Sequence, residues 1–174
     1  KGSPFFLQER PGKGEKIFKI IKFTSMNDKK DASGNLLSAS IRITKLGTFI
    51  RRYSLDEMPQ LLNVIKGDMS LIGPRPLMVH YLPYYNETER KRHTVRPGIT
   101  GLAQVKGRNS LVWEDRFALD VHYVEKLNLA HDAKILYWTI LKMLSKSEVA
   151  IDQDEYLDWF NIYRKKQWEA DNAS

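Results

Sequence analysis

Two adjacent carboxylates, Asp56 and Glu57, stand in the stretch YSLDEMPQLLNV, which runs from Tyr53 to Val64. A carboxylate can act as a nucleophile that accepts a phosphoryl group, and a second carboxylate beside it can handle a proton. Neighbouring side chains on a helix are separated by about 100°, so one acid could meet the phosphorus of a substrate while the other reaches an acceptor. The pair is therefore a candidate catalytic site for phosphoryl transfer.

The same stretch also fits the beginning of a helix. Ser54 and Glu57 have the S-x-x-E spacing of a capping box, which would leave Pro59 inside the helix and kink it. If Asp56 is the cap instead, Pro59 falls in the first turn, where its missing N–H is tolerated. Both placements put the carboxylates at the positive end of the helix dipole, which lowers the pKa of a carboxyl group. The structural and the catalytic interpretations are compatible.

Two cations elsewhere in the chain are candidate partners of a phosphate. Arg75 lies in GPRP between Pro74 and Pro76, which restrict the backbone, and arginine binds phosphate through two hydrogen bonds at once. Lys22 lies in KIIKF, which reads as a strand. The alternatives are a surface ion pair for Arg75 and a solvent-facing strand position for Lys22.

The stretch RPGITGLAQVKGRN, residues 96–109, holds further binding candidates: Arg96, Gln104 and Arg108. Its glycines permit close approach of the backbone to a ligand. The amide of Gln104 carries both a donor and an acceptor, which suits a base edge and also suits hydrogen bonds within a loop. These three residues are therefore candidate contacts for a ligand such as a nucleotide or a sugar.

The composition restricts the class of protein. The 174 residues fit one domain, and the absence of cysteine excludes disulfides, zinc thiolate sites and cysteine nucleophiles. The net charge of +7 implies an anionic partner, such as nucleic acid, a membrane surface or a phosphorylated substrate. A basic domain with a merely solvated surface is the alternative. No stretch approaches the ~20 apolar residues that span a bilayer.

Hydrophobic patterning predicts a helix-rich α+β domain with a small β-sheet. A catalytic domain is expected over residues 1–150, followed by an aromatic amphipathic helix or tail over 151–174. We predict extended or turn-like chain over 5–13, strands at 16–23 and 69–73, and a loop with a short strand but no helix at 96–109. Helices are expected at 43–52, 56–66, 78–92, 113–127, 133–146 (capped by Asp132) and 152–169.

Aromatic side chains recur at helical spacing in the last of these helices. Tyr156, Phe160 and Tyr163 form the stripe, Trp159 and Trp168 lie nearby, and cations follow. Amphipathic aromatics beside cations suit a membrane interface. They equally suit a helix that packs on the domain or on a neighbouring chain, so both interpretations stay open.

Four motifs in a fixed order resemble the bacterial sugar transferase family, the small monotopic phosphoglycosyl transferases. They are RPG at 10–12, KIFKIIKFTSM at 16–26, SLDEMPQLLNVIKGDMSLIGPRP at 54–76 and RPGITGLAQVKGRN at 96–109. The resemblance runs from Ser3 to about Leu144. It implies an enzyme that moves a sugar-1-phosphate from a UDP-sugar to undecaprenyl phosphate and releases UMP, as the first membrane step of bacterial glycan assembly.

The resemblance also implies a role for each site residue. Asp56 matches the nucleophile that attacks the β-phosphorus and forms a phosphosugar-aspartyl intermediate. Glu57 matches its partner, which handles the proton of the acceptor. Magnesium is the implied cofactor, bound near Asp56 and the diphosphate, and Lys22 and Arg75 match cations that contact phosphate. Thr24 is a departure, since many members have arginine there.

The implied setting is the cytoplasmic face of the bacterial inner membrane, where the protein lies on the membrane surface. Family members of this size begin with a hydrophobic re-entrant helix, and GSPFFLQERPG matches the stretch that follows it. We therefore expect the present chain to lack that anchor. An N-acetylated amino sugar is the typical donor of the resembled group, and a homodimer is possible.

Two other functions remain as alternatives. The charge and the basic RKRH at 90–93 would suit a nucleic-acid-binding domain, but no recognised nucleic-acid motif accompanies them, and we expect no nucleic-acid partner. A non-catalytic domain on a membrane surface is the second alternative.

Overall fold

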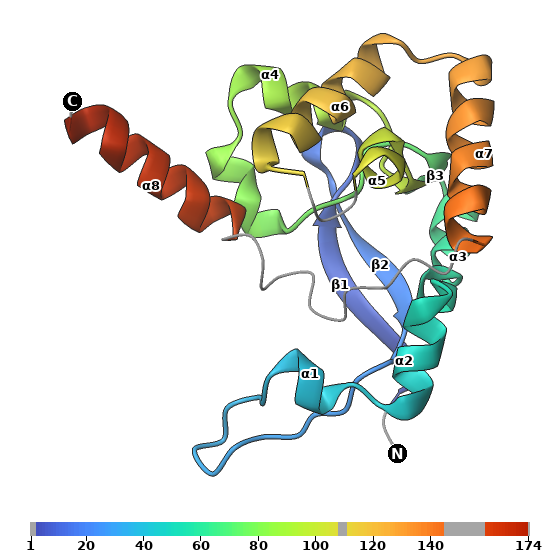
Figure 1. Cartoon of the computed structure of the whole chain (residues 1–174), viewed down its shortest axis with the longest axis vertical. Helices are drawn as coiled ribbons and strands as arrows, with labels where there is room; N and C mark the ends of the chain where they lie inside the picture. Colours follow the sequence, from blue (N-terminus) through green and yellow to red (C-terminus); the bar gives the residue numbers. More distant parts are fainter. Residues whose placement is uncertain (1–2, 108–110, 145–158, 174) are drawn as a thin grey trace.

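The computed structural model describes residues 3–107, 111–144 and 159–173. Within these ranges the chain forms mostly helices and two separate two-stranded sheets (Figure 1). This mixture agrees with the predicted helix-rich α+β class, although the strands form two sheets instead of one. No helix in the described ranges is long and apolar enough to cross a membrane.

An antiparallel hairpin forms the first sheet. Strand β1 (Phe5–Pro11) pairs with β2 (Ile17–Phe23) along its whole length, and the 3-10 turn η1 (Lys13–Glu15) joins them. The predicted strand at 16–23 is thus confirmed, and the extended chain predicted before it forms β1. The hairpin is a long ribbon that projects beyond the helical body toward α1 and α2 (Figure 1).

Helices α1 (Ala39–Arg42) and α2 (Lys45–Arg52) follow a polar loop. The prediction of a helix over 43–52 is confirmed by α2. Its N-cap, Thr44, accepts a hydrogen bond from the backbone N–H of Gly47, which satisfies one free donor of the first turn.

The predicted helix over 56–66 is divided in two. A 3-10 turn, η2 (Leu55–Glu57), comes first, and α3 (Gln60–Ile65) begins after Pro59. Proline lacks the N–H that a continuous helix would require there, so it starts α3 instead of lying inside it. Gly67 has φ +83° and turns the chain after α3.

The predicted helix over 78–92 is wrong. The chain forms three short elements instead: η3 (Val79–Tyr84), α4 (Glu87–Arg90) and η4 (Lys91–Thr94). Pro83 lies within η3, and a capping box between Asn86 and Glu89 begins α4 afresh.

Strand β3 (Ser70–Ile72) pairs in parallel with β4 (Gly98–Thr100), which confirms both predicted short strands. The exclusion of a helix from 96–109 is wrong, because α5 (Leu102–Lys106) follows β4. Gly101 is the N-cap of α5 and Gly107 its C-cap. These two glycines therefore lie at the ends of the helix and do not interrupt it.

Three longer helices complete the fold. Helix α6 (Trp113–Glu125) confirms the prediction at 113–127. Helix α7 (Leu129–Leu144) starts earlier than predicted, so Asp132 lies in its first turn and accepts a hydrogen bond from the Tyr123 hydroxyl. Helix α8 (Phe160–Ala173) starts later than predicted; Tyr156 and the rest of 152–158 lie outside the described residues.

The aromatic stripe of α8 packs on the domain. Phe160 is fully buried in a cluster with five other residues, and Tyr163 packs against the same cluster. Arg164 pairs with the buried Glu89, while Trp159 and Trp168 remain partly exposed. Figure 1 shows α8 meeting the body at its first turns. The cluster consists of Leu77, Tyr81, Tyr85, Trp113, Phe117 and Phe160.

Candidate active site

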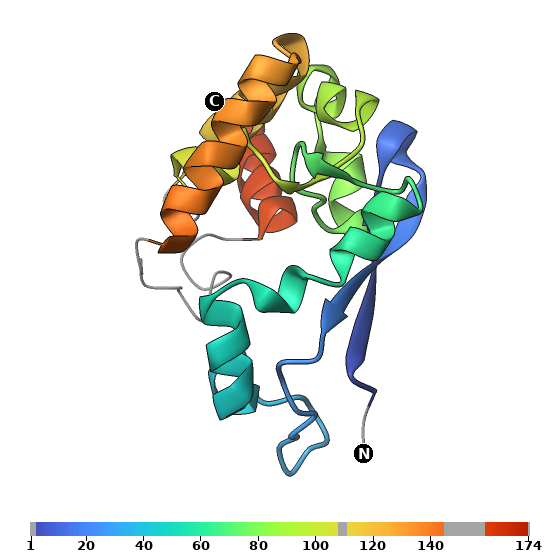
Figure 2. The ribbon, with the colours of Figure 1, turned by 90° about the vertical axis from the view of Figure 1, so that its right-hand side faces the viewer.

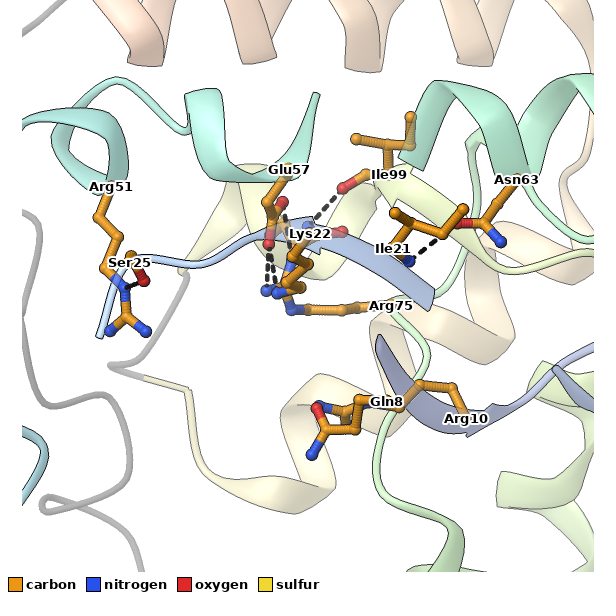
Figure 3. Close-up of polar contacts among 11 residues, drawn as sticks. Gln8, Arg10, Ile21, Lys22, Ser25, Arg51, Glu57, Asn63, Arg75 and Ile99 are labelled. Carbon is orange, nitrogen blue, oxygen red and sulfur yellow. Dashed lines mark hydrogen bonds and ion pairs between the residues drawn. The ribbon is translucent and has the colours of Figure 1, made fainter. Parts of the chain in front are cut away.

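Glu57 lies between two cations that come from distant parts of the chain (Figure 3). Lys22 Nζ on β2 lies 3.1 Å from Glu57 Oε1. Arg75, in the loop after β3, donates through Nη2 to Oε1 at 2.6 Å and through Nη1 to Oε2 at 3.3 Å. The fold thus brings together three of the residues that the sequence predicts.

The two cations determine the ionisation of Glu57. Burial alone would raise the pKa of its carboxyl group, but Arg75 and Lys22 lower that pKa to about 2. The capping box expected between Ser54 and Glu57 is wrong. Ser54 has φ +54° and makes no side-chain cap hydrogen bond, and the Glu57 carboxylate binds the cations instead.

Asp56 has the opposite electrostatic environment. It is half-buried, and burial together with the negative charge of Glu57 raises the pKa of its carboxyl group, while Lys22 and Arg51 oppose the rise. Among the residues that the structure describes, no ion pair includes Asp56. Its carboxylate is therefore available to a substrate or a metal, whereas that of Glu57 is already engaged.

Lys22 is held in place by a buried amide beneath β2. Asn63 of α3, which is 1% exposed, accepts a hydrogen bond from the Ile21 N–H at 3.1 Å and donates to the Lys19 carbonyl at 2.9 Å. Lys22 itself is largely buried, so the solvent-facing alternative is wrong. Burial is also the main reason that the pKa of Lys22 is lowered, against the opposing effect of Glu57. Sequence patterning gave no signal for Asn63.

Arg51, in the last turn of α2, is a further cation that acts on Asp56. Its Nε donates to Ser25 Oγ at 2.8 Å, which ties the end of α2 to the chain after β2 (Figure 3). This approach requires glycine at position 47, since a Cβ atom there would lie 1.9 Å from the Ser25 carbonyl oxygen. A glycine inside an amphipathic helix is the signal that could have indicated the contact.

The loop that carries Arg75 is fixed against β4. The N–H of Gly73 donates to Thr100 at 2.9 Å, and the N–H of Gly98 donates to the Pro74 carbonyl at 3.0 Å. A Cβ atom at Gly98 would lie 2.1 Å from Gly73 N. Small residues at both positions therefore permit the close contact that sets the path of GPRP.

Two of the three predicted nucleotide- or sugar-binding residues, Arg96 and Gln104, form their hydrogen bonds away from this group. Arg96 is exposed and donates through Nε to the Gly67 carbonyl at 2.8 Å, so it braces the turn after α3. Gln104 donates to the Ile99 carbonyl at 3.0 Å, the expected alternative of a loop hydrogen bond, and its Oε1 is buried without a partner in the described chain. Arg108 lies outside the described residues.

The donor set near Asp56 fits a metal that is shared with a substrate. No group of three His, Cys, Asp or Glu side chains in the described ranges could hold a metal ion. Mg²⁺, however, is commonly bound by one or two carboxylates together with substrate phosphates. Asp56 offers such a carboxylate, and Glu57 does not, because its oxygens already accept from Lys22 and Arg75.

Comparison with known proteins identifies the family. The model of the family described as "Bacterial sugar transferase" matches residues 1–146. The sugar transferase EpsL of Bacillus subtilis is 54% identical over 144 residues, which are 82% of this chain and 71% of EpsL. The galactosyl transferase CpsE of Streptococcus agalactiae is 40% identical, over 82% of this chain and 35% of CpsE.

A third relative carries a more specific name. The UDP-glucose:undecaprenyl-phosphate glucose-1-phosphate transferase of Caulobacter vibrioides is 36% identical, over 83% of this chain and 58% of its own length. The chain thus spans more than two thirds of EpsL but only a part of the other two relatives. The family match includes every element of the site from β2 to α5, and the chain belongs to the bacterial sugar transferase family.

Proposed function

We propose that this protein transfers a sugar-1-phosphate from a UDP-sugar to undecaprenyl phosphate and releases UMP. The names of relatives support the reaction class, since one of them transfers glucose-1-phosphate to that lipid carrier. The observation that carries the proposal is the unequal state of two adjacent acids: Glu57 is paired with two cations, and Asp56 has no ion-pair partner in the described chain.

In the first step, a carboxylate oxygen of Asp56 forms a bond to the β-phosphorus of the UDP-sugar. The bond between that phosphorus and the bridging oxygen breaks, and UMP leaves with the electron pair. In the second step, a phosphate oxygen of undecaprenyl phosphate attacks the same phosphorus, and the bond to Asp56 breaks. The carboxylate is regenerated, and the product is a lipid-linked sugar diphosphate.

Lys22 and Arg75 would offset the repulsion between the attacking carboxylate and the diphosphate. Both already converge on Glu57, at 3.1 and 2.6 Å, so Glu57 fixes the direction of both cations. A carboxyl group with a pKa of about 2 holds a proton poorly. We therefore assign to Glu57 the orientation of the cations in preference to the transfer of a proton.

Magnesium would be held by Asp56 together with oxygens of the diphosphate. When bound, it would reduce the negative charge of the diphosphate and help to position it. The residues of this chain then act by binding and orientation: Asp56 supplies the nucleophile, and Lys22 and Arg75 bind the phosphate oxygens that surround it.

The membrane surface is the proposed location, on the cytoplasmic face of the bacterial inner membrane. Large apolar side chains are exposed along α2, η2 and α3. These three consecutive elements lie along the right-hand side in Figure 1, which faces the viewer in Figure 2. Cations flank them on α2, as suits an interface with anionic lipid. We call this set the apolar edge; it consists of Leu46, Phe49, Tyr53, Leu55, Met58, Leu61, Leu62 and Ile65.

The identity of the transferred sugar is the next question for the substrate. An N-acetylated amino sugar remains our prediction from the resemblance, while relatives are named for glucose and galactosyl transfer. A panel of UDP-sugars, each tested with Mg²⁺ and undecaprenyl phosphate in detergent or vesicles, would measure UMP release. We expect release to require the lipid acceptor for repeated turnover and to stop when the metal is chelated.

The matched control for this assay is Asp115→Asn, because Asp115 is an exposed acid on α6. It should release UMP at the wild-type rate. Binding to vesicles without UMP release from any UDP-sugar would support the alternative of a non-catalytic membrane-surface domain. The mass of the detergent-solubilised protein tests whether it forms a homodimer.

A further inference from the structure

A buried ion pair lies behind the loop that carries Arg75. Arg92 of η4 and Asp120 of α6 are each 2% exposed, and their Nη2–Oδ2 distance is 2.8 Å. The Nε of Arg92 donates to the same Asp120 oxygen at 3.1 Å. Nη1 donates to the Tyr85 hydroxyl at 3.2 Å, and Nη2 also donates to the backbone carbonyl of Arg75 at 2.7 Å.

The surroundings hold Arg92 in one orientation. Its guanidinium lies 5.5 Å from the ring centroid of Phe117 and 5.7 Å from that of Tyr85. Burial disfavours the charged form, but Asp120 outweighs burial and raises the pKa of Arg92. A fully buried, charged and planar group that donates four hydrogen bonds leaves little freedom to the atoms that it binds.

The contact with the Arg75 carbonyl is informative because of the residues around it. Pro74 and Pro76 have no N–H, so the backbone of this loop forms hydrogen bonds mainly through its carbonyl groups. The Pro74 carbonyl accepts from Gly98, and the Arg75 carbonyl accepts from Arg92. Arg92 thus fixes the backbone at the residue whose side chain binds Glu57 on the opposite side.

We propose that Arg92 is a positioning residue for the transfer reaction, which acts by holding the Arg75 carbonyl so that the Arg75 guanidinium faces Glu57 and the substrate phosphates. The inference rests on the proposed function, because it presupposes that Arg75 binds the phosphates. The competing explanation is that the buried pair only stabilises the fold.

Removing the charges of Arg92 and Asp120 together distinguishes the two explanations. Replacing a buried ion pair with apolar residues of similar volume often leaves stability unchanged or increases it. The double variant Arg92→Met/Asp120→Leu would therefore fold, as near-UV circular dichroism and thermal unfolding can verify, yet it lacks the hydrogen bond to the Arg75 carbonyl. We expect kcat for UMP release to fall about 10- to 100-fold, because a misplacement of about 1 Å can cost about 10²-fold in rate.

A cycle with Arg75→Ala tests whether Arg92 acts through the Arg75 side chain. Once that side chain is absent, the Arg92→Met/Asp120→Leu change should lower kcat no further, so the losses do not multiply. A purely structural role predicts that they multiply. If the apolar pair does not fold, the same cycle is measured with Arg92→Lys, which keeps the charge beside Asp120 but not the planar fork that spans all three partners.

Arg90→Met is the matched control. Arg90 also donates to a backbone carbonyl, that of Leu82, at 2.8 Å, and pairs with an acid, Glu15. Its loss should leave kcat close to that of the wild type. The positioning role would be overturned if folded Arg92→Met/Asp120→Leu had the kcat of the wild type. It would also be overturned if the losses in kcat from this change and from Arg75→Ala multiplied in the combined variant. Wild-type kcat in Arg75→Ala would instead show that the proposed role of Arg75 itself fails, which distinguishes the two claims.

Discussion

Glu57 accepts hydrogen bonds from both terminal nitrogens of Arg75, at 2.6 and 3.3 Å, while its sequence neighbour Asp56 forms no ion pair in the described ranges. The environments of the two acids push their pKa values in opposite directions: that of Glu57 falls to about 2, and that of Asp56 rises. Such a difference is typical of paired catalytic carboxylates with separate tasks.

The stability of the protein should depend on Glu57 in acid. Its pKa is depressed in the folded state, from an ordinary value of 4.5 to about 2, so its ion pairs stabilise the fold above pH 4.5 and are lost as the pH falls toward 2. That shift corresponds to about 3 kcal/mol at most. Urea unfolding from pH 7 to pH 2 should show this loss in the wild type and a flatter profile in Glu57→Gln.

The control for this measurement is Glu125→Gln. Glu125 pairs with Lys91, and both side chains are about half exposed. Its profile should follow that of the wild type, because exposed pairs contribute little. An identical profile for Glu57→Gln and the wild type would contradict the assigned ion pairs.

The fall of kcat/KM at low pH, the acid limb of the profile, should result from protonation of Asp56. Glu57 stays ionised down to a pH of about 2, whereas burial and Glu57 raise the pKa of Asp56, and the nucleophile must be ionised to react. Arg51 favours the ionised form of Asp56. Arg51→Met should therefore raise that pKa and move the acid limb of kcat/KM to higher pH.

Arg52→Met is the neighbouring control, since Arg52 is exposed and has no part in the shift of Asp56. Its acid limb should coincide with that of the wild type. A limb that moves to lower pH in Arg51→Met, or does not move, would contradict the assignment to Asp56.

Helix α8 should contribute to stability through Phe160. The ring is fully buried and lies 4.9 Å from the ring of Phe117, centroid to centroid. Phe160→Ala should lower the free energy of unfolding by about 3–5 kcal/mol. Ile162→Ala on the same helix, at a side chain that is 42% exposed, should cost much less. Equal effects in the two variants would argue against the packed position of α8.

The sequence predicted the parts of the site that depend on local chemistry. The acids of SLDE and the arginine of GPRP are recognisable by residue type and by the restriction that proline imposes. The partners of Glu57 were not predictable, because Lys22 and Arg75 meet it only after β2, η2 and the loop after β3 pack together. Asn63 and Arg92 act through backbone groups of distant segments, and nothing in the local pattern indicates such contacts.

Errors in the predicted elements have a similar origin. The prediction of no helix at 96–109 is wrong because Gly101 and Gly107 lie at the two ends of α5 and leave its interior to good helix formers. The aromatic stripe of α8 fitted a membrane as well as a core, because periodicity identifies an apolar face but not what covers it. Tertiary packing decided both cases.

The apolar edge should mediate attachment to vesicles. Leu46 is 70% exposed and Phe49 54% exposed on α2. Leu46→Ser/Phe49→Ser should reduce co-flotation with vesicles that contain phosphatidylglycerol, because apolar area is removed from the interface. Leu129→Ser is the control, at an 88% exposed leucine on α7 outside this edge. Equal loss in the control, or none in the double variant, would contradict the proposed orientation on the membrane.

The most direct test of the account is the covalent state of Asp56. The protein would be incubated with a UDP-sugar that supports UMP release, with Mg²⁺ and without undecaprenyl phosphate, then quenched and analysed by peptide mass spectrometry. The account predicts that the peptide with Asp56 gains the mass of the sugar phosphate, that the adduct disappears when undecaprenyl phosphate is added, and that Asp56→Asn neither forms it nor releases UMP. Normal turnover by Asp56→Asn, or an adduct on another residue, would contradict the assignment of the nucleophile.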